Sequence, residues 1–91
     1  MFQNIQYGES MREYVSIHFE NGKIITKIGI GEIEKLLQGN FLRIHRSYLI
    51  NVEKLTAYNA EEIFIGKTSL PIGTNYKKLV GMVLGKDHAT Q

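Results

Sequence analysis

Short runs of β-branched and aromatic residues recur along most of the chain, and turn residues separate them. Two of these runs, Tyr14–Phe19 and Lys23–Ile28, flank Asn21-Gly22, a dipeptide that strongly favours a β-hairpin. An earlier run reads FQNIQY, and later ones read FLRI, YLINV, KLTAYN, EIFIG and TSLPI. Pro71 cannot donate a ladder hydrogen bond, so we expect it at an edge or a strand end. The pattern predicts an all-β or β-dominated domain, and not alternating βα units.

Two segments have helical spacing instead. In IGEIEKLLQGN, Ile30, Ile33 and Leu37 share one helix face, and Gly39 is predicted as the C′ residue of a short helix. The segment TNYKKLVGMVLGK predicts a C-terminal helix. Its apolar stripe, which we expect to be buried in the core, consists of Tyr76, Leu79, Val80, Val83 and Leu84.

The predicted C-terminal helix has candidate end signals and one costly interior residue. Thr74 is the expected N-cap and Gly85 the expected end. Gly81 costs about 1 kcal/mol relative to alanine, so we expect it to pack closely against another backbone segment.

The stretch FLRIHRSYLIN poses the main structural question. A straight strand would place Arg46 on the same face as Leu42 and Ile44, and burying a lone guanidinium among aliphatic side chains is very costly. Either Arg46 has a buried partner, or the strand breaks at His45–Ser47 and these polar residues point outward.

Composition narrows the class of protein. The chain has 91 residues, with 43% hydrophobic and 22% charged residues, as expected for one globular domain. No apolar run approaches the roughly 20 residues of a membrane helix, and the first residues lack a signal-peptide core, so we expect a cytoplasmic protein without membrane contact. The absence of cysteine excludes disulfides, thiolate zinc sites and thiol nucleophiles.

Positive charge is concentrated in the second half of the chain. Up to Asn40 there are four Lys or Arg residues against five Asp or Glu, and from Phe41 onward there are seven against four. Lys77 and Lys78 fall in the first turn of the predicted C-terminal helix, where the helix dipole already adds positive charge. Both lysines are either solvated or placed to bind a phosphate.

No enzymatic or metal-binding constellation is apparent. His18, His45 and His88 lack the spacing of metal ligands, and Gly29-x-Gly31-x-x-Glu34 lacks the third glycine of a dinucleotide fingerprint. Nothing assembles a nucleophile, a base and an oxyanion site, so we expect neither catalysis nor a cofactor. Because His18 alternates with apolar neighbours, we expect it on the solvated face of its strand.

The central run and a later segment together resemble the LytTR (LytR/AlgR-type) DNA-binding domain of bacterial transcription regulators. The resemblance extends in order from Ile5 to Leu84. The residues of the central run that carry it are Phe41, Arg43, His45, Arg46, Ser47, Tyr48 and Asn51. The later segment contributes Pro71, Ile72 and Tyr76.

The resemblance implies a mostly β fold of short antiparallel strands in small stacked sheets. It also implies that loops, and not a recognition helix, enter the major groove of double-stranded DNA. Three places are expected to face DNA: the loop between the first strands (Ser10 to Tyr14), the His45–Arg46 turn and the start of the last helix. The expected DNA-binding residues are Arg12, Glu13, Tyr14, His45, Arg46, Ser47, Thr74, Asn75, Lys77 and Lys78. This chain departs from the family at Gly73-Thr74, where Ser-Arg is common, so one expected guanidinium is missing.

Some of these residues also have structural alternatives. Arg46 could form a surface salt bridge with Glu13 or Glu53, and His45 could fix its turn through a hydrogen bond from its ring to a backbone carbonyl. Asn51 is expected to form a turn, and Tyr48 to pack in the core or sheet.

We therefore interpret residues 1–91 as one LytTR-like domain, the output module of a response regulator in two-component signalling. The implied partners are DNA, expected as direct repeats with a second copy on the adjacent repeat, and a receiver domain in the full-length protein. The alternative is a protein-interaction or dimerisation module that uses a sheet edge and binds no nucleic acid. Apolar dimerisation would persist at high salt, whereas DNA binding would weaken steeply.

Overall fold

The computed structural model describes residues 4–37 and 39–87, and two antiparallel sheets make up most of this part of the chain. The first sheet contains β1 (Ile5–Met11), β2 (Tyr14–Phe19), β3 (Gly22–Thr26), β4 (Phe41–His45) and β5 (Tyr48–Asn51). The second contains β6 (Ala57–Tyr58), β7 (Glu62–Ile65) and β8 (Thr68–Pro71). The helices are α1 (Ile30–Leu36) and α2 (Lys77–Asp87), and the 3-10 turns η2 (Val52–Lys54) and η3 (Thr74–Tyr76) complete the elements. The predicted mostly β class with one short helix and a C-terminal helix is confirmed.

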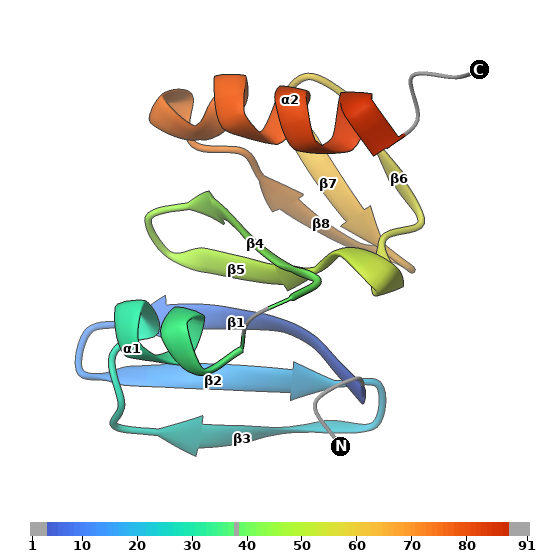
Figure 1. Cartoon of the computed structure of the whole chain (residues 1–91). Coiled ribbons are helices and arrows are strands. Elements are labelled where there is room, and N and C mark those ends of the chain that lie inside the picture. The colour runs from blue at the N-terminus through green and yellow to red at the C-terminus, as the bar shows by residue number, and fades with distance from the viewer. Residues whose placement is uncertain (1–3, 38, 88–91) are drawn as a thin grey trace.

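The strand order of the first sheet is β3-β2-β1-β5-β4. The hairpin predicted from Asn21-Gly22 is present, with Phe19 paired to Gly22 in antiparallel register. The strand predicted from FQNIQY begins at Ile5 in the described part, and Phe2 lies outside the described residues. The β1 and β5 strands pair in the middle of the sheet, and this pairing brings the two hairpins β1–β2 and β4–β5 side by side (Figure 1).

Two apolar clusters hold the layers together. The larger one joins both sheets and α2, with Ile44 and Ile50 from the first sheet, Ile63 from the second and Leu84 from α2 all fully buried. The smaller one lies between α1 and the first sheet. Figure 1 shows α2 above β7 and β8, and it shows α1 beside β1 of the first sheet.

The C-terminal helix differs from its sequence prediction at both ends. Thr74 begins the 3-10 turn η3, whose N-cap is Gly73, and no side chain caps this turn, so the prediction of Thr74 as N-cap was wrong. The helix passes through Gly85 and ends at Asp87, so Gly85 does not terminate it. Glycine is tolerated inside a helix at a modest cost, and packing of Val80 and Leu84 compensates for that cost here.

Two further predictions for this helix were wrong. Leu79 is 47% exposed, because the second sheet and β4 cover only the face of α2 that carries Val80 and Leu84. Gly81 is exposed, and a Cβ placed there would meet nothing within 4 Å, so no backbone packs closely against it.

The prediction for Gly39 was wrong, whereas that for Pro71 is confirmed. The helix α1 ends at Leu36 with Leu37 as its C-cap, so Gly39 follows two residues after the cap and is not the C′ residue. Gly39 does adopt a positive φ of 93°, which glycine tolerates without strain. Pro71 is the last residue of β8, an edge strand, as expected. Among the described residues, no helix is long and apolar enough to cross a membrane.

Candidate nucleic-acid interface

The strand in the FLRIHRSYLIN stretch breaks at a tight turn. Leu42 and Ile44 are buried in β4, the turn consists of Arg46 and Ser47, and β5 begins at Tyr48. Arg46 is exposed, and none of the carboxylates in the described ranges forms an ion pair with it. The cost of burying a guanidinium is therefore avoided by turning the chain, and the Arg46 side chain stays available to a partner.

The side chain of His45 stabilises this turn through a hydrogen bond to the turn's backbone. Its Nδ1 atom accepts a hydrogen bond of 3.0 Å from the amide of Ser47, and its ring lies 5.3 Å from the ring of Tyr48. His45 thus fixes its turn through a backbone hydrogen bond, but the partner is an amide and not the expected carbonyl. Because Nδ1 is the acceptor, a neutral His45 ring carries its proton on Nε2, which is then a hydrogen-bond donor.

Arg43 contacts the turn from the α1 side of β4. Its Nε atom donates to the carbonyl of His45 at 2.9 Å, and its Nη2 atom donates to the carbonyl of Arg46 at 2.7 Å. Its Nη1 atom forms an ion pair of 2.7 Å with Glu34 of α1. Sequence reasoning gave Arg43 no role of its own, because the positions of the two carbonyls are not visible in a residue pattern.

The segment before α2 packs against the same turn. The amide of Gly73 donates a hydrogen bond of 2.8 Å to the carbonyl of Ile44, at a position where the pairing of β4 with β5 has a register shift. A Cβ at Gly73 would lie 3.3 Å from Cδ2 of His45 and 3.1 Å from Cδ1 of Tyr76. A pocket of about 150 Å³ lies at this junction, lined by His45, Arg46, Gly73, Thr74, Asn75 and Tyr76.

The β1–β2 turn lies on the other side of the β4–β5 turn. The amide of Ser10 donates to the carbonyl of Ser47 at 2.8 Å, and Met11 pairs with Tyr14 around the two turn residues. Arg12 and Glu13 form this turn and are exposed, and Tyr14 is 41% exposed. Hydrogen bonds therefore join three segments into one edge, which we call the three-turn edge: residues 10–14, residues 45–47 and residues 73–78.

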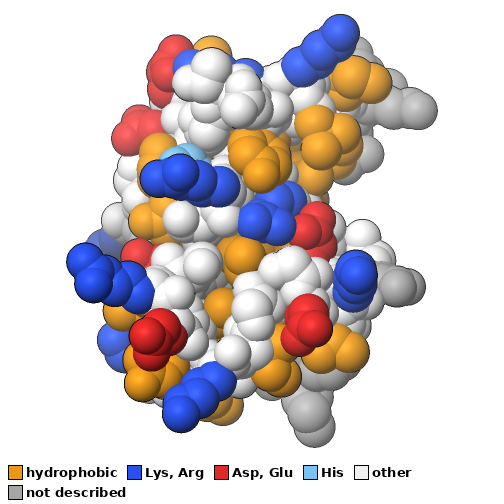
Figure 2. Space-filling model, turned by 90° about the vertical axis from the view of Figure 1, so that its left-hand side faces the viewer, with side chains coloured by type: hydrophobic (Ala, Val, Ile, Leu, Met, Phe, Trp, Pro, Cys, Tyr) orange, Lys and Arg blue, Asp and Glu red, His pale blue; other side chains and the backbone are white. Residues whose placement is uncertain are grey.

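The three-turn edge faces the viewer in Figure 2, which shows Lys and Arg side chains spread over this side of the molecule, with Asp and Glu side chains among them. The two lysines at the start of α2 differ in their contacts. Lys78 is exposed, whereas Nζ of Lys77 forms an ion pair of 2.6 Å with Glu61, in the loop before β7. Their predicted position in the first turn of the helix is confirmed, but Lys77 already has an acidic partner.

A known family of domains matches nearly the whole chain. The sequence profile of the LytTr DNA-binding domain matches residues 1–85. The chain belongs to the LytTR DNA-binding domain family. This family is non-catalytic, and membership implies DNA binding in transcription regulation.

A solved structure is similar to this LytTR domain. It is the LytTr DNA-binding domain of a putative methyl-accepting/DNA response regulator from Bacillus cereus, with a TM-score of 0.83 and 23% sequence identity. The match covers 92% of this chain and 84% of that chain, and it confirms the fold. No curated protein sequence matches the chain.

The structure places most of the expected DNA-binding residues along one edge of the LytTR domain. Arg12, Arg46, Thr74, Asn75 and Lys78 are exposed along the three-turn edge, while contact of any of them with DNA stays a prediction. Two other residues have the structural roles expected of them. Asn51 is buried, donates from Nδ2 to the carbonyl of Ile5 at 2.8 Å and accepts from the amide of Glu53 at 3.0 Å. Tyr48 packs against the larger apolar cluster.

A partly buried polar cluster lies on β1, β2 and β5. The side chain of His18 is only 22% exposed and its ring stacks on Tyr7 at 4.2 Å, so the prediction of a solvated His18 was wrong. The Nε2 atom of His18 is buried without a hydrogen-bond partner and lies 3.8 Å from Oε1 of Glu9. Tyr48 donates to Oε2 of Glu9 at 3.5 Å.

Burial dominates the titration of this cluster. It lowers the pKa of His18 and outweighs the opposite effect of Glu9. It also raises the pKa of Tyr7 and Tyr48, and Glu9 adds to the rise in both pKa values. Because desolvation penalises the charged form, burial favours the neutral state of all three side chains in the folded LytTR domain.

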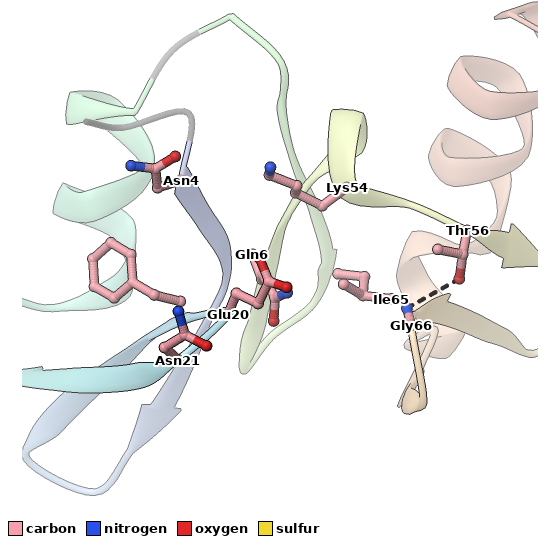
Figure 3. A pocket seen from close by; sticks show the side chains of 9 residues that line it. Asn4, Gln6, Glu20, Asn21, Lys54, Thr56, Ile65 and Gly66 are labelled. Carbon is pink, nitrogen blue, oxygen red and sulfur yellow. Dashed lines mark hydrogen bonds between the residues drawn. The ribbon is translucent and has the colours of Figure 1, made fainter.

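Another cavity lies far from the three-turn edge, between the β2–β3 turn and the end of η2 (Figure 3). It has a volume of about 540 Å³ and is lined by Asn4, Gln6, Phe19, Glu20, Asn21, Lys54, Thr56, Ile65 and Gly66. The amide of Gly66 donates to Oγ1 of Thr56 at 3.1 Å on its wall. Across the described part of the chain, no group of three His, Asp or Glu side chains could hold a metal ion, and His88 lies outside that part.

Proposed function

We propose that this LytTR domain binds double-stranded DNA sequence-specifically through the three-turn edge, with its turns entering the major groove. The observation that supports this most directly is the β4–β5 turn. It exposes Arg46 without an ion pair while hydrogen bonds from Arg43, Ser10 and Gly73 reach the turn and the hairpin that carries it. A guanidinium presented on a well-held backbone is suited to bidentate recognition of guanine.

The two outer parts of the edge supply the phosphate contacts in this proposal. Arg12 in the β1–β2 turn and Lys78 at the start of α2 are exposed on either side of the β4–β5 turn. Cations placed on both sides of a base-reading group can neutralise phosphates that border the groove, which positions the reader without adding sequence information. Lys77 contributes once its ion pair with Glu61 is exchanged for a phosphate.

In the full-length protein, we place residues 1–91 at the output end of a response regulator in two-component signalling, with a receiver domain as its second module. The target in this proposal is a pair of direct repeats, with a second copy of the domain on the adjacent repeat. A domain with a single reading edge contacts only a short stretch of bases, and two linked copies multiply the affinity of each.

A second candidate function is supported by one surface. Ile24, Ile28 and Leu36 are 57%, 40% and 62% exposed on the α1 side of the edge strand β3. An exposed aliphatic patch at a sheet edge is typical of a surface that pairs with another protein. This surface is separate from the three-turn edge in sequence, so a protein partner there is compatible with DNA binding.

The deciding experiment is selection of bound duplexes from a random DNA pool, followed by titration of the winning sequence at several salt concentrations. Specific DNA binding predicts enriched sequences that contain paired direct repeats, and an affinity that falls steeply with salt. Failure to enrich any sequence, combined with salt-independent self-association, would favour the protein-interaction function.

A further inference from the structure

We propose that Arg43 and Glu34 are positioning residues that set the sequence specificity of the β4–β5 turn without touching DNA themselves. This inference rests on the proposed function of the three-turn edge. It assigns to α1 a role in DNA recognition that neither its position outside the edge nor its sequence suggests.

The guanidinium of Arg43 makes three directed contacts. It donates to the carbonyls of His45 and Arg46 at 2.9 and 2.7 Å, and so holds two consecutive peptide groups of the turn with one planar group. Its third contact, to Glu34 at 2.7 Å, uses another of its five N–H groups. The Arg43 side chain is 18% exposed, so its charge faces the protein more than the solvent.

Glu34 fixes the guanidinium from a separately anchored element. The helix α1 is attached to the first sheet by Ile30 and Ile33, which are buried in the smaller apolar cluster. A charge-assisted contact from a held carboxylate keeps the Arg43 fork in one orientation. Without Glu34, the guanidinium is free to turn away from the two carbonyls and toward another anion.

The consequence for recognition is preorganisation. Arg46 reads bases only if its backbone is placed correctly, and the Arg43 contact to the Arg46 carbonyl fixes that backbone before DNA arrives. A reader that is ordered in advance loses less conformational freedom on binding, and misplacement by about 1 Å weakens a directed contact strongly. Loss of the clamp should therefore reduce specific binding and leave binding to unrelated DNA unchanged.

The experiment compares Glu34→Ala, Glu34→Gln and Arg43→Gln with Glu32→Ala, an exposed glutamate on the same helix. Each variant is titrated with the selected duplex and with a scrambled duplex across a salt series. We expect Glu34→Ala and Arg43→Gln to lose roughly 10- to 100-fold in affinity for the selected duplex, with unchanged affinity for the scrambled one and an unchanged salt slope. Glu34→Gln keeps an acceptor for Nη1 of Arg43 and should stay near wild type, as should Glu32→Ala.

Amide hydrogen exchange in the free protein tests the clamp independently of DNA. We expect the exchange of the Ser47 amide to accelerate in Glu34→Ala and Arg43→Gln but not in Glu32→Ala. Unchanged exchange together with wild-type affinity in Glu34→Ala would overturn the proposal. A salt slope shallower by about one unit in Arg43→Gln would also overturn it, because Arg43 would then contact a phosphate directly. If wild-type protein selects no DNA while the exchange results hold, the proposed function fails and the clamp stands as a structural feature only.

Discussion

The amide of Gly73 donates a hydrogen bond of 2.8 Å to the carbonyl of Ile44. This bond attaches the segment before α2 to the β4–β5 hairpin, at the place where the pairing of β4 with β5 shifts register. A β-bulge beside a functional turn changes the direction of the side chains that follow it. Here it lets Gly73 approach His45 closely, and a side chain in place of Gly73 would press on the His45 ring.

We expect Arg46→Ala to weaken binding to the selected duplex by about 1–3 kcal/mol and to relax base preference at one position. The melting temperature should change little, because Arg46 is exposed and has no ion pair in the described part of the chain. Titration and thermal unfolding of the same samples measure both effects. Lys67→Ala is the matched control, since Lys67 is exposed in the turn between β7 and β8. Early melting of Arg46→Ala would show a structural role and remove Arg46 as the reader.

The two lysines at the start of α2 should differ in how much they contribute to DNA binding. Lys78→Gln should weaken binding to all sequences about equally and make the salt slope shallower by roughly one unit. Lys77→Gln should have a smaller effect, because Lys77 is paired with Glu61 before DNA arrives. Glu61→Gln frees Lys77 and removes a negative charge, so it should tighten binding. Equal salt slopes in wild type and Lys78→Gln would exclude a phosphate contact by Lys78.

Thr74→Arg restores the arginine that is common at this position in the family. A gain on the order of 1–2 kcal/mol in binding is expected from one extra charged contact to DNA. Because the Thr74 side chain is exposed and caps no helix, the substitution should not destabilise the fold. The titration is repeated with Thr74→Gln, which adds length without charge. Identical affinities for the two variants would mean that η3 does not face DNA.

The stability of the domain should depend on pH through His18. Burial lowers the pKa of folded His18 below its ordinary value of 6.5. The unfolded chain therefore binds a proton more readily than the folded one, and the free energy of unfolding falls as pH drops below about 6.5. The loss continues until the pH passes the lowered folded pKa. Urea unfolding between pH 7.5 and 5 measures this dependence, and His18→Gln should flatten it. The same pH dependence in both proteins would assign it to other groups.

Much of the local structure follows from the sequence alone. Asn21-Gly22 predicted a hairpin, and alternation placed Leu42 and Ile44 on one face of a strand, where both are buried. The cost of burying Arg46 left a buried partner or a break in the strand as alternatives, and the resemblance favoured the break that the structure shows. These predictions succeed because each depends on one segment: strand periodicity, turn geometry and the desolvation of a charge act over a few residues.

The tertiary structure decided which segments meet and which faces stay open. Sequence periodicity indicated that Leu79 lies on an apolar stripe, but only the position of the second sheet and β4 determined that it is exposed. The stacking of His18 on Tyr7, the pairing of Lys77 with Glu61 and the contacts of Arg43 with a turn and a helix all join different elements. Such contacts depend on how sheets and helices pack in three dimensions, and the energy of packing is shared among many residues along the chain. The sequence of this LytTR domain therefore determined most of its strands, whereas their packing decided that Arg46 is exposed and brought three turns to one edge.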